Sequence, residues 1–274
     1  MTSHCTEILV GLISAIMFRS ARTALTRHNG VMTWDYSQSA WSTFSVTFRE
    51  PAGRWGICKA LSAQWIVDHA YGGSLFNRIT NGRGDVDPSA IRMIQQNFAI
   101  ASGNQADETK DFLIKRGILE RRGSLCFSVT RSVRREGQRV EITNNSYGER
   151  NLSESGSNGN VAIALAAALK NVSNCYAQIG FGPTAGTGHA VAAWVGGPSY
   201  GSGGDVAFFD PNFGEGWFAK KTDFFEWFEY FYRVSYAGFP CKFNGRWDVS
   251  QWALSNTAAK GAYAKAVLSV AGPR

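Results

Sequence analysis

The chain has 274 residues, of which 44% are apolar and 13% aromatic, so it can bury a sizeable core and is not intrinsically disordered. Its formal net charge is +7, but no aromatic interleaving, helix-turn-helix signal or zinc-finger spacing accompanies the basic residues, so nucleic acid is not expected as a partner. The five cysteines are odd in number and form no C-x-x-C pair, which argues against a zinc site or a disulfide framework and favours a reducing environment.

The first fifty residues show no clear element. Residues 8–18 form an apolar run that is too short to span a bilayer, for which about 20 residues are needed. No Lys or Arg precedes this run and no small-residue cleavage motif follows it, so it lacks the form of a standard signal peptide. A buried helix or strand, or a propeptide, is the simpler interpretation of the run. We predict that residues 1–50 form a poorly defined N-terminal segment, either a secretion signal or a propeptide, in front of a domain at residues 51–274.

Residues 57–70 have the spacing of a helix that begins directly after a glycine-containing loop. Cys58, Leu61 and Trp65 fall on one stripe, and two glycines from Gly72 onward supply the stop signal. Cys58 therefore lies in the first turn, where unpaired backbone N–H groups and the positive end of the helix dipole lower a thiol pKa. A free cysteine on an apolar stripe is usually a core residue, but this position makes Cys58 a candidate nucleophile.

Helices and strands are interspersed along the rest of the chain. We predict a helix of about four turns from Pro88, helices over 107–119, 161–170 and 224–232, strands over 124–130 and 175–181, and a polar loop over 143–160. The polar loop is the best place to divide the chain in two. The aromatic helix at 224–232 is expected to cap a sheet.

Basic residues are concentrated in residues 115–139. This segment holds eight basic and two acidic residues, a surplus of +6 that is nearly the whole net charge of the chain. Such a segment could contact an anionic membrane surface or an acidic partner. A solvated strand and turn is the simpler interpretation, and both stay open.

Two apolar strands near residue 200 predict an antiparallel hairpin, because a glycine-rich stretch at 196–204 separates them. We place His189 opposite Asp210, where Cβ atoms of opposed residues are roughly 4.5–5.5 Å apart. In this register Val191 pairs with Phe208 and Ala193 pairs with Val206. The carboxylate can then accept a proton from the near imidazole nitrogen and leave the far nitrogen free to act as a base.

A base of this kind needs a nucleophile within hydrogen-bond reach. The chain has no G-x-S-x-G elbow for a serine, and among the cysteines Cys58 alone sits at a predicted helix start. His69 lies eleven residues further along the same helix, about 16 Å away, which is out of reach of Cys58. Because His4 and His28 lie in the poorly defined N-terminal segment, His189 is the remaining partner for Cys58, with Asp210 behind it.

Three blocks in this order carry a resemblance to a known family: Gly56–Leu61 with Trp65, then Gly188–Val191, then Phe208–Glu215. Over roughly residues 53–220 the chain resembles the YopT- and AvrPphB-like cysteine proteases, bacterial effectors with a papain-like fold. The resemblance implies an α+β fold in which the nucleophile begins a central helix packed on an antiparallel sheet that carries the histidine and the acid. It implies Cys58 as nucleophile, His189 as general base and Asp210 as orienting acid in a catalytic domain at 51–274.

The resemblance also implies a biological setting. Family members are virulence effectors that bacteria deliver into host cells by type III secretion, where they cleave host proteins, and some also process their own N-terminus. We therefore expect secretion into a host cell, a host protein as substrate, and no cofactor or metal. The papain-like pattern usually includes a Gln or Asn shortly before the cysteine, which completes the oxyanion hole. Residues 52–55 of this chain are instead Ala, Gly, Arg and Trp. The Cys58 backbone N–H and the Arg54 side chain are the candidate donors in its place.

Two other function classes stay open at this point. The same triad could serve an acyltransferase, a transglutaminase or an amidase, because fold and triad do not fix the acceptor. A non-enzymatic alternative is a binding module in which Asp205, Asp210, Asn212 and Glu215 hold a cation. The spacing of an EF-hand fails there, because Gly214 and Glu215 are adjacent where five residues should intervene.

Overall fold

The protein is described from a computed structural model, which covers residues 18–38, 57–81, 83–102, 108–123, 130–135, 138–144, 150–151, 154–157, 160–183, 188–197, 203–237 and 243–255. Three sequence predictions fall largely outside these ranges. They are the apolar run at 8–18, the candidate oxyanion residues at 52–55 and the strand at 124–130. The side chains of the basic segment beyond residue 121 also lie outside the description.

The helices are α3 (Ile57–Ala70), α4 (Leu75–Ile79), α5 (Pro88–Ser102), α6 (Glu108–Ile114), α7 (Val161–Leu169) and α8 (Lys221–Tyr232), which continues into a π-helix at Arg233–Ala237. The strands are β1 (Gly30–Asp35), β2 (Ile118–Glu120), β3 (Arg122–Gly123), β4 (Thr130–Arg135), β5 (Gln138–Asn144), β6 (Arg150–Asn151), β7 (Glu154–Ser157), β8 (Cys175–Gly182), β9 (His189–Val195), β10 (Val206–Asp210), β11 (Gly214–Phe218) and β12 (Arg246–Leu254). Residues 18–27 are also helical. Among the helices that the structure describes, none is both long enough and apolar enough to span a membrane.

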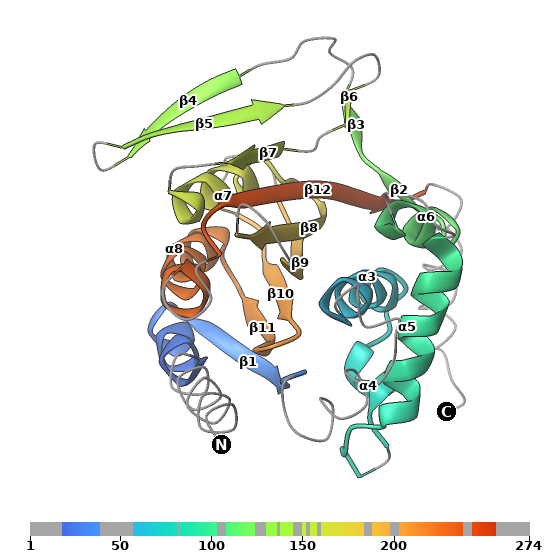
Figure 1. The fold of residues 1–274 in the computed structure, drawn as a ribbon. Coiled ribbons are helices and arrows are strands. Elements are labelled where there is room, and N and C mark those ends of the chain that lie inside the picture. Colours follow the sequence, from blue (N-terminus) through green and yellow to red (C-terminus); the bar gives the residue numbers. More distant parts are fainter. Residues whose placement is uncertain are drawn as a thin grey trace, which may run out of the picture.

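A ten-stranded antiparallel sheet organises the described residues, and β3 and β6 form a second, two-stranded sheet. The strand order of the larger sheet is β1-β11-β10-β9-β8-β12-β7-β5-β4, and β2 joins it by pairing with β12. Helices α7 and α8 lie on one side of this sheet, and α3 lies on the other side with α4, α5 and α6 behind it (Figure 1). The predicted α+β class with an antiparallel sheet is therefore confirmed.

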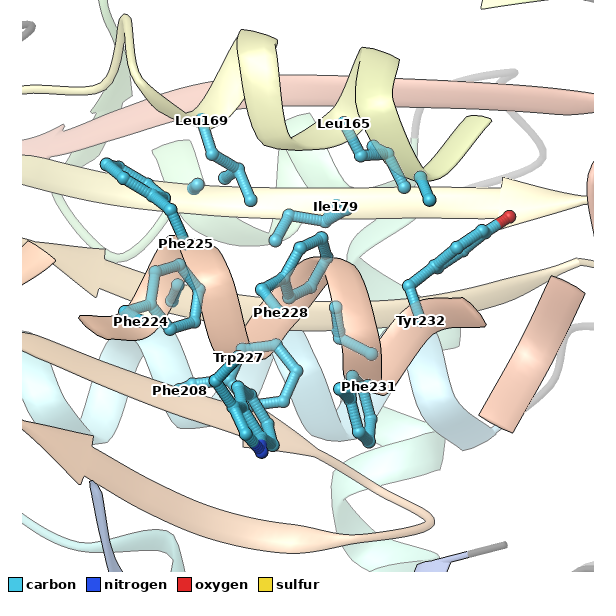
Figure 2. Packing of buried hydrophobic residues seen from close by; sticks show 14 of the residues in the cluster. Leu165, Leu169, Ile179, Phe208, Phe224, Phe225, Trp227, Phe228, Phe231 and Tyr232 are labelled. Atoms are coloured by element: carbon cyan, nitrogen blue, oxygen red, sulfur yellow. The ribbon is translucent and has the colours of Figure 1, made fainter. Parts of the chain in front are cut away.

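The two faces of the sheet bury two separate apolar clusters, and strand β10 shows how one strand serves both. Val206 and Phe208 point into the cluster under α7 and α8, whereas Ala207 and Phe209 point into the cluster under α3. This alternation follows from the two-residue repeat of strand side chains. The first cluster is unusually aromatic, because side chains of α8 surround Phe208 (Figure 2). The prediction that the aromatic helix caps the sheet is confirmed.

Helix α3 occupies the bounds predicted for it and is enclosed on nearly every side. Eleven of its fourteen residues are buried, because the sheet covers one face and α5 covers the other. The buried Asp68 carboxylate is compensated by Arg78, whose Nε donates to it at 2.7 Å. A helix held in this way gives its first turn a fixed place relative to the strands.

Two element predictions are wrong in part. The helix expected over 107–119 ends at Ile114, because Gly117 takes a positive φ of 75° and residues 118–120 instead pair with β12. The loop expected over 143–160 contains the short strands β6 and β7, and β7 pairs with β12. In both places cross-strand pairing overrides a local signal.

The described part of the N-terminal segment is joined to the main sheet. Strand β1 pairs with β11 at one sheet edge, and the helix at 18–27 packs into the aromatic cluster through Ala21 and Leu25. The indole Nε1 of Trp227 donates to the Ala21 carbonyl at 3.0 Å, which ties this helix to α8. The division of the chain at residue 50 stays a prediction.

Candidate active site

Cys58 is the second residue of α3, as the helical spacing predicts, and its side chain is buried. Burial by itself would raise the pKa of the thiol. The hydrogen bond and charge of His189, together with the backbone N–H groups of Ala190 and Lys59, outweigh burial and hold the pKa of Cys58 below its usual value. The thiolate is thus the form that these surroundings favour.

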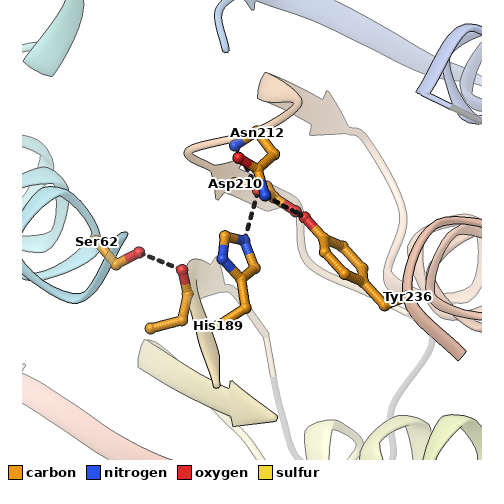
Figure 3. Close-up of polar contacts among 6 residues, drawn as sticks. Ser62, His189, Asp210, Asn212 and Tyr236 are labelled. Atoms are coloured by element: carbon orange, nitrogen blue, oxygen red, sulfur yellow. Dashed lines mark hydrogen bonds and ion pairs between the residues drawn. The ribbon is translucent and has the colours of Figure 1, made fainter. Parts of the chain in front are cut away.

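His189 begins strand β9 and faces both of the other predicted residues. Its Nε2 lies 2.9 Å from Oδ1 of Asp210 (Figure 3). Its ring also hydrogen-bonds the Cys58 thiol. Burial by itself would lower the pKa of this imidazole. The Asp210 carboxylate and the Cys58 sulfur outweigh burial and raise the pKa of His189 to about 10. A lowered thiol pKa beside a raised imidazole pKa favours a thiolate–imidazolium pair.

The predicted hairpin register is wrong by two residues. Phe208 pairs with Ala193 rather than with Val191, and Val206 pairs with Val195. The loop closes later than predicted because Gly197 and Gly204, both with positive φ, form its ends. A shift of two residues keeps every side chain on its predicted face. His189 and Asp210 are therefore diagonal neighbours on one face, a separation that their side chains bridge.

Asp210 is fully buried at the end of β10, and hydrogen bonds to both of its oxygens compensate the carboxylate. Oδ1 accepts from His189 and from the backbone N–H of Asn212 at 2.7 Å, and Oδ2 accepts from the Tyr236 hydroxyl at 2.6 Å. These three donors satisfy a carboxylate that would otherwise be costly to bury. They also fix the plane in which it meets the imidazole.

The residues that follow Asp210 form the turn that places it. Gly214 has a φ of 110°, and a Cβ there would overlap the backbone oxygen of Trp34, so glycine is required at this position. Glu215 then accepts hydrogen bonds from Trp65 Nε1 at 2.6 Å and from Thr33 Oγ1 at 2.8 Å. The third block of the sequence motif thus links α3, β11 and β1.

Helix α3 is also attached directly to β9 one turn after the cysteine. The Ser62 hydroxyl donates to the carbonyl of Ala190 at 2.9 Å, next to His189 (Figure 3). This bond lies on the same side of the helix as the cysteine, since residues four apart share a face. It holds the start of α3 against the start of β9.

The cation-binding alternative gains no support. Asp210 and Glu215 accept hydrogen bonds from different partners, and Asp205 accepts from the indole of Trp217 at 3.2 Å. Within the part of the chain that the structure describes, no group of three or more His, Cys, Asp or Glu side chains could hold a metal ion.

His69, the histidine that helix length predicts to be out of reach, lies in the last turn of α3. Its Nδ1 is 2.8 Å from the hydroxyl of Tyr176, and its ring packs against Trp65 and Trp194. Burial lowers the pKa of His69, and the charges of Glu215 and Asp205 only partly oppose this. It belongs to the core at the other end of the helix.

Tyr236 is the site residue that sequence reasoning misses. It lies in the π-helix at Arg233–Ala237, is almost fully buried, and contacts both Asp210 and His189. A single π turn has no periodicity of its own in a sequence. The one available signal is its position, four residues after an aromatic run that ends at Tyr232.

Comparisons with known proteins match most of the chain. Residues 22–243 match the Peptidase_C58 family model, described as Yersinia/Haemophilus virulence surface antigen. The cysteine protease yopT1 of Yersinia enterocolitica serotype O:8 is 29% identical over 216 residues, and the cysteine protease YopT of Yersinia pestis is 27% identical over 214 residues. Each alignment covers 76% of this chain but only 60% of the relative. The crystal structure of the Pseudomonas avirulence protein AvrPphB aligns over 73% of this chain and 92% of its own, with 15% identity and a TM-score of 0.45.

Proposed function

Because the chain belongs to the family described as Yersinia/Haemophilus virulence surface antigen, we propose that it is a cysteine protease in which Cys58, His189 and Asp210 form a catalytic triad. One observation carries the proposal. The imidazole of His189 hydrogen-bonds the Cys58 thiol on one side and lies 2.9 Å from the Asp210 carboxylate on the other. The names of the relatives, which are cysteine proteases, support the reaction class.

The proposed reaction starts from the thiolate–imidazolium pair. The Cys58 sulfur attacks a peptide carbonyl carbon, and the electron pair of the C=O bond moves to oxygen. When that pair returns, the C–N bond breaks and the proton on His189 Nδ1 passes to the leaving amine. His189 then takes a proton from water, the resulting hydroxide attacks the thioester, and the carboxylic acid product leaves as the thiolate and imidazolium are restored.

The positions of the three residues also support a papain-like arrangement. The nucleophile begins a buried helix, and the sheet on which the helix packs supplies the base and the acid. The backbone N–H of Cys58 belongs to the unpaired donors of the first helical turn, so it is suited to bind the oxyanion. Arg54 stays a proposal for the second donor, as does a domain beginning at residue 51.

A cleavage assay without a chosen substrate tests the function. We would incubate the wild-type chain and Cys58→Ala with a peptide library made from host-cell proteins, and identify new N-termini by mass spectrometry. Cys175→Ala is the matched control, because Cys175 is a second buried, free cysteine that pairs with Val195, at the end of β9 away from His189. Wild type and Cys175→Ala should produce the same new N-termini, and Cys58→Ala should produce none.

New N-termini from Cys58→Ala at the wild-type level would refute the proposal. The same spectra distinguish hydrolysis from the alternative chemistries. An acyltransferase or transglutaminase would yield peptides of increased mass in place of shortened ones, and an amidase would shift the mass without chain scission.

The setting of the reaction is a further part of the proposal. We propose that the protein is a virulence effector that a bacterium secretes into a host cell, where it cleaves a host protein. The description of its family as a virulence surface antigen supports the link to virulence. Cleavage within its own first fifty residues is the second expected event. The chain spans 60% of the length of the relatives it matches, so their substrates are not transferred to it. Mass spectrometry of the purified chain, with Cys58→Ala as the uncleaved reference, tests self-processing.

The basic segment 115–139 is proposed to contact an anionic membrane surface near the substrate. The β4–β5 register pairs Arg134 with Arg139. Co-sedimentation with phosphatidylserine vesicles should weaken when both are changed to Gln. The double variant Arg83→Gln and Arg92→Gln, which removes the same charge elsewhere, is the control. Equal binding by both double variants would remove this part of the proposal.

A further inference from the structure

Tyr236 contacts the acid–base pair from the side opposite to α3. In Figure 3 the imidazole of His189 lies between the helix that carries Ser62 and the segment that carries Tyr236. The Tyr236 hydroxyl is 2.6 Å from Asp210 Oδ2, and the ring centroids of Tyr236 and His189 are 5.0 Å apart with planes inclined by 24°. One side chain thus touches both members of the pair.

The direction of the Tyr236 hydroxyl proton follows from its neighbours. The side-chain amide of Asn212 donates to the phenol oxygen at 3.2 Å, which occupies the oxygen as an acceptor. Asp210 Oδ2 offers only an acceptor to the same hydroxyl, so the Tyr236 proton points at the carboxylate. A phenol held in this way gives the carboxylate a directed donor on the oxygen opposite to His189.

The ring of Tyr236 limits the orientations of the imidazole. Tyr236 stacks on one side of His189, and Phe181 meets His189 in an edge contact at 5.5 Å. The face of an aromatic ring also attracts a cation, so stacking favours the protonated imidazole over the neutral one. The neighbouring Phe243 stacks on Tyr236 with planes inclined by 10°, and its backbone N–H donates to the Tyr236 carbonyl at 2.8 Å.

The π-helix explains how Tyr236 reaches this place. Helix α8 packs its aromatic side chains into the core beneath β10. If the α-helix continued, the following side chains would keep the same angular spacing around its axis. A π turn widens the helix locally and changes the direction of the next side chain. Such turns are often found at functional sites. Here the turn brings Tyr236 next to the end of β10, where Asp210 lies.

We propose that Tyr236 is a positioning residue of the site: its hydroxyl orients Asp210, and its ring stabilises the protonated His189 and thereby the Cys58 thiolate. This proposal rests on the proposed protease function, but it also makes a statement about thiol reactivity that needs no substrate. In this proposal the effect of Tyr236 reaches Cys58 through His189.

The test is the pH dependence of Cys58 alkylation by iodoacetamide, followed by peptide mass spectrometry, in the full chain. Tyr236→Phe removes the hydroxyl and keeps the ring. It should move the acidic limb of the alkylation profile upward by about one pH unit and lower kcat about tenfold, with KM unchanged. Tyr236→Leu removes the ring as well and should produce a larger change in the same direction.

Tyr232→Phe is the matched control, because Tyr232 is also a buried tyrosine of the same segment but its hydroxyl donates to the backbone carbonyl of Phe243. It should leave the alkylation profile in place. If Tyr236→Phe does not fold, as judged by circular dichroism, Asn212→Ala provides the second variant. It keeps Tyr236 but removes the amide that directs its hydroxyl, and should shift the limb in the same direction by a smaller amount.

The outcomes separate the two proposals. Suppose that alkylation of wild-type Cys58 is already fast at low pH and that neither Tyr236→Phe nor Asn212→Ala shifts this pH. The positioning role is then refuted while the triad stands. A shift in Tyr232→Phe equal to that in Tyr236→Phe would also refute it, since a general packing defect would then explain both. If wild-type Cys58 behaves as an ordinary thiol and no peptide is cleaved, the protease function itself fails.

Discussion

Two histidines at opposite ends of α3 have similar surroundings and opposite titration behaviour. His189 is buried and His69 is partly buried, both pack against aromatic rings, and both have a tyrosine close by. The pKa of His69 is lowered, whereas that of His189 is raised to about 10. The difference is a carboxylate in direct contact, because Asp210 hydrogen-bonds His189 while His69 meets only the neutral hydroxyl of Tyr176.

The comparison shows what converts a core histidine into a candidate base. Burial lowers an imidazole pKa at both ends of the helix, since it penalises the charged form. Aromatic neighbours are present at both ends and so do not explain the difference. A buried carboxylate with its own hydrogen-bond donors reverses the direction of the pKa shift, and it is present only beside His189. The following predictions test this contrast, from the largest expected effect to the smallest.

Replacing each histidine by alanine should separate the two ends most clearly. His189→Ala removes the proposed base and the partner of the thiolate, so kcat/KM should fall by about 1,000-fold or more. His69→Ala removes a core contact and a bond to Tyr176, so it should lower thermal stability and leave kcat/KM of the folded fraction within a few-fold. Peptide cleavage and thermal melting measure the two effects. A comparable loss of kcat/KM in both variants would contradict the contrast.

Asp210→Asn should lower the pKa of His189, as the pKa of His69 is lowered. The amide keeps a similar shape but lacks the charge that raises the imidazole pKa, so the pKa of His189 should fall from about 10. The thiol then loses its cationic partner, and kcat/KM should fall about 100-fold. Histidine side-chain NMR reads the pKa directly. Asp68→Asn is the control, because Asp68 is a buried carboxylate of α3 that is paired with Arg78.

Site residues in regular helices and strands could be predicted from the sequence, because the side chains of these elements repeat with a fixed period. Cys58 follows from the 3.6-residue period of α3, and the shared face of His189 and Asp210 follows from the two-residue period of strands. The register between those strands does not follow, because a glycine-rich loop can close at several places at similar cost. Tyr236 could not be predicted from periodicity, since a single π turn has no repeat.

The fold shows the same division. Long periodic helices such as α3 and α7 were predicted within a residue of their bounds. Strand β1 was missed because it is a sheet edge with a single buried residue, so its sequence offers little apolar signal. Short strands such as β2 and β7 depend on pairing with β12, a partner far away in the sequence. Only tertiary contacts define such elements.

The pH dependence of the wild-type chain should show both titrations of the pair. A lowered thiol pKa means that the Cys58 thiolate is present below the range of an ordinary thiol, about 8.5, and alkylation should already be fast at neutral pH. A raised imidazole pKa means that His189 keeps its proton until the pH approaches about 10, so activity that needs this proton should decline there. NMR should show His69 neutral throughout the same range. An alkylation rate that rises only above pH 8.5 would contradict the ion pair.

The smallest expected effect concerns the attachment of α3 to β9. Ser62→Ala removes the hydroxyl that donates to the carbonyl of Ala190, next to His189. The free energy of unfolding should fall by about 1 kcal/mol, because one buried hydrogen bond is lost and the carbonyl keeps its strand environment. Since the same bond holds the start of the helix against the start of β9, kcat should also fall by a few-fold while KM changes little. Gln64→Ala, two residues along, breaks a bond within α3 to Asp68 and leaves β9 untouched. It should lower stability to a similar degree without the change in kcat, and equal kcat values in the two variants would show that this attachment has no part in aligning Cys58 with His189.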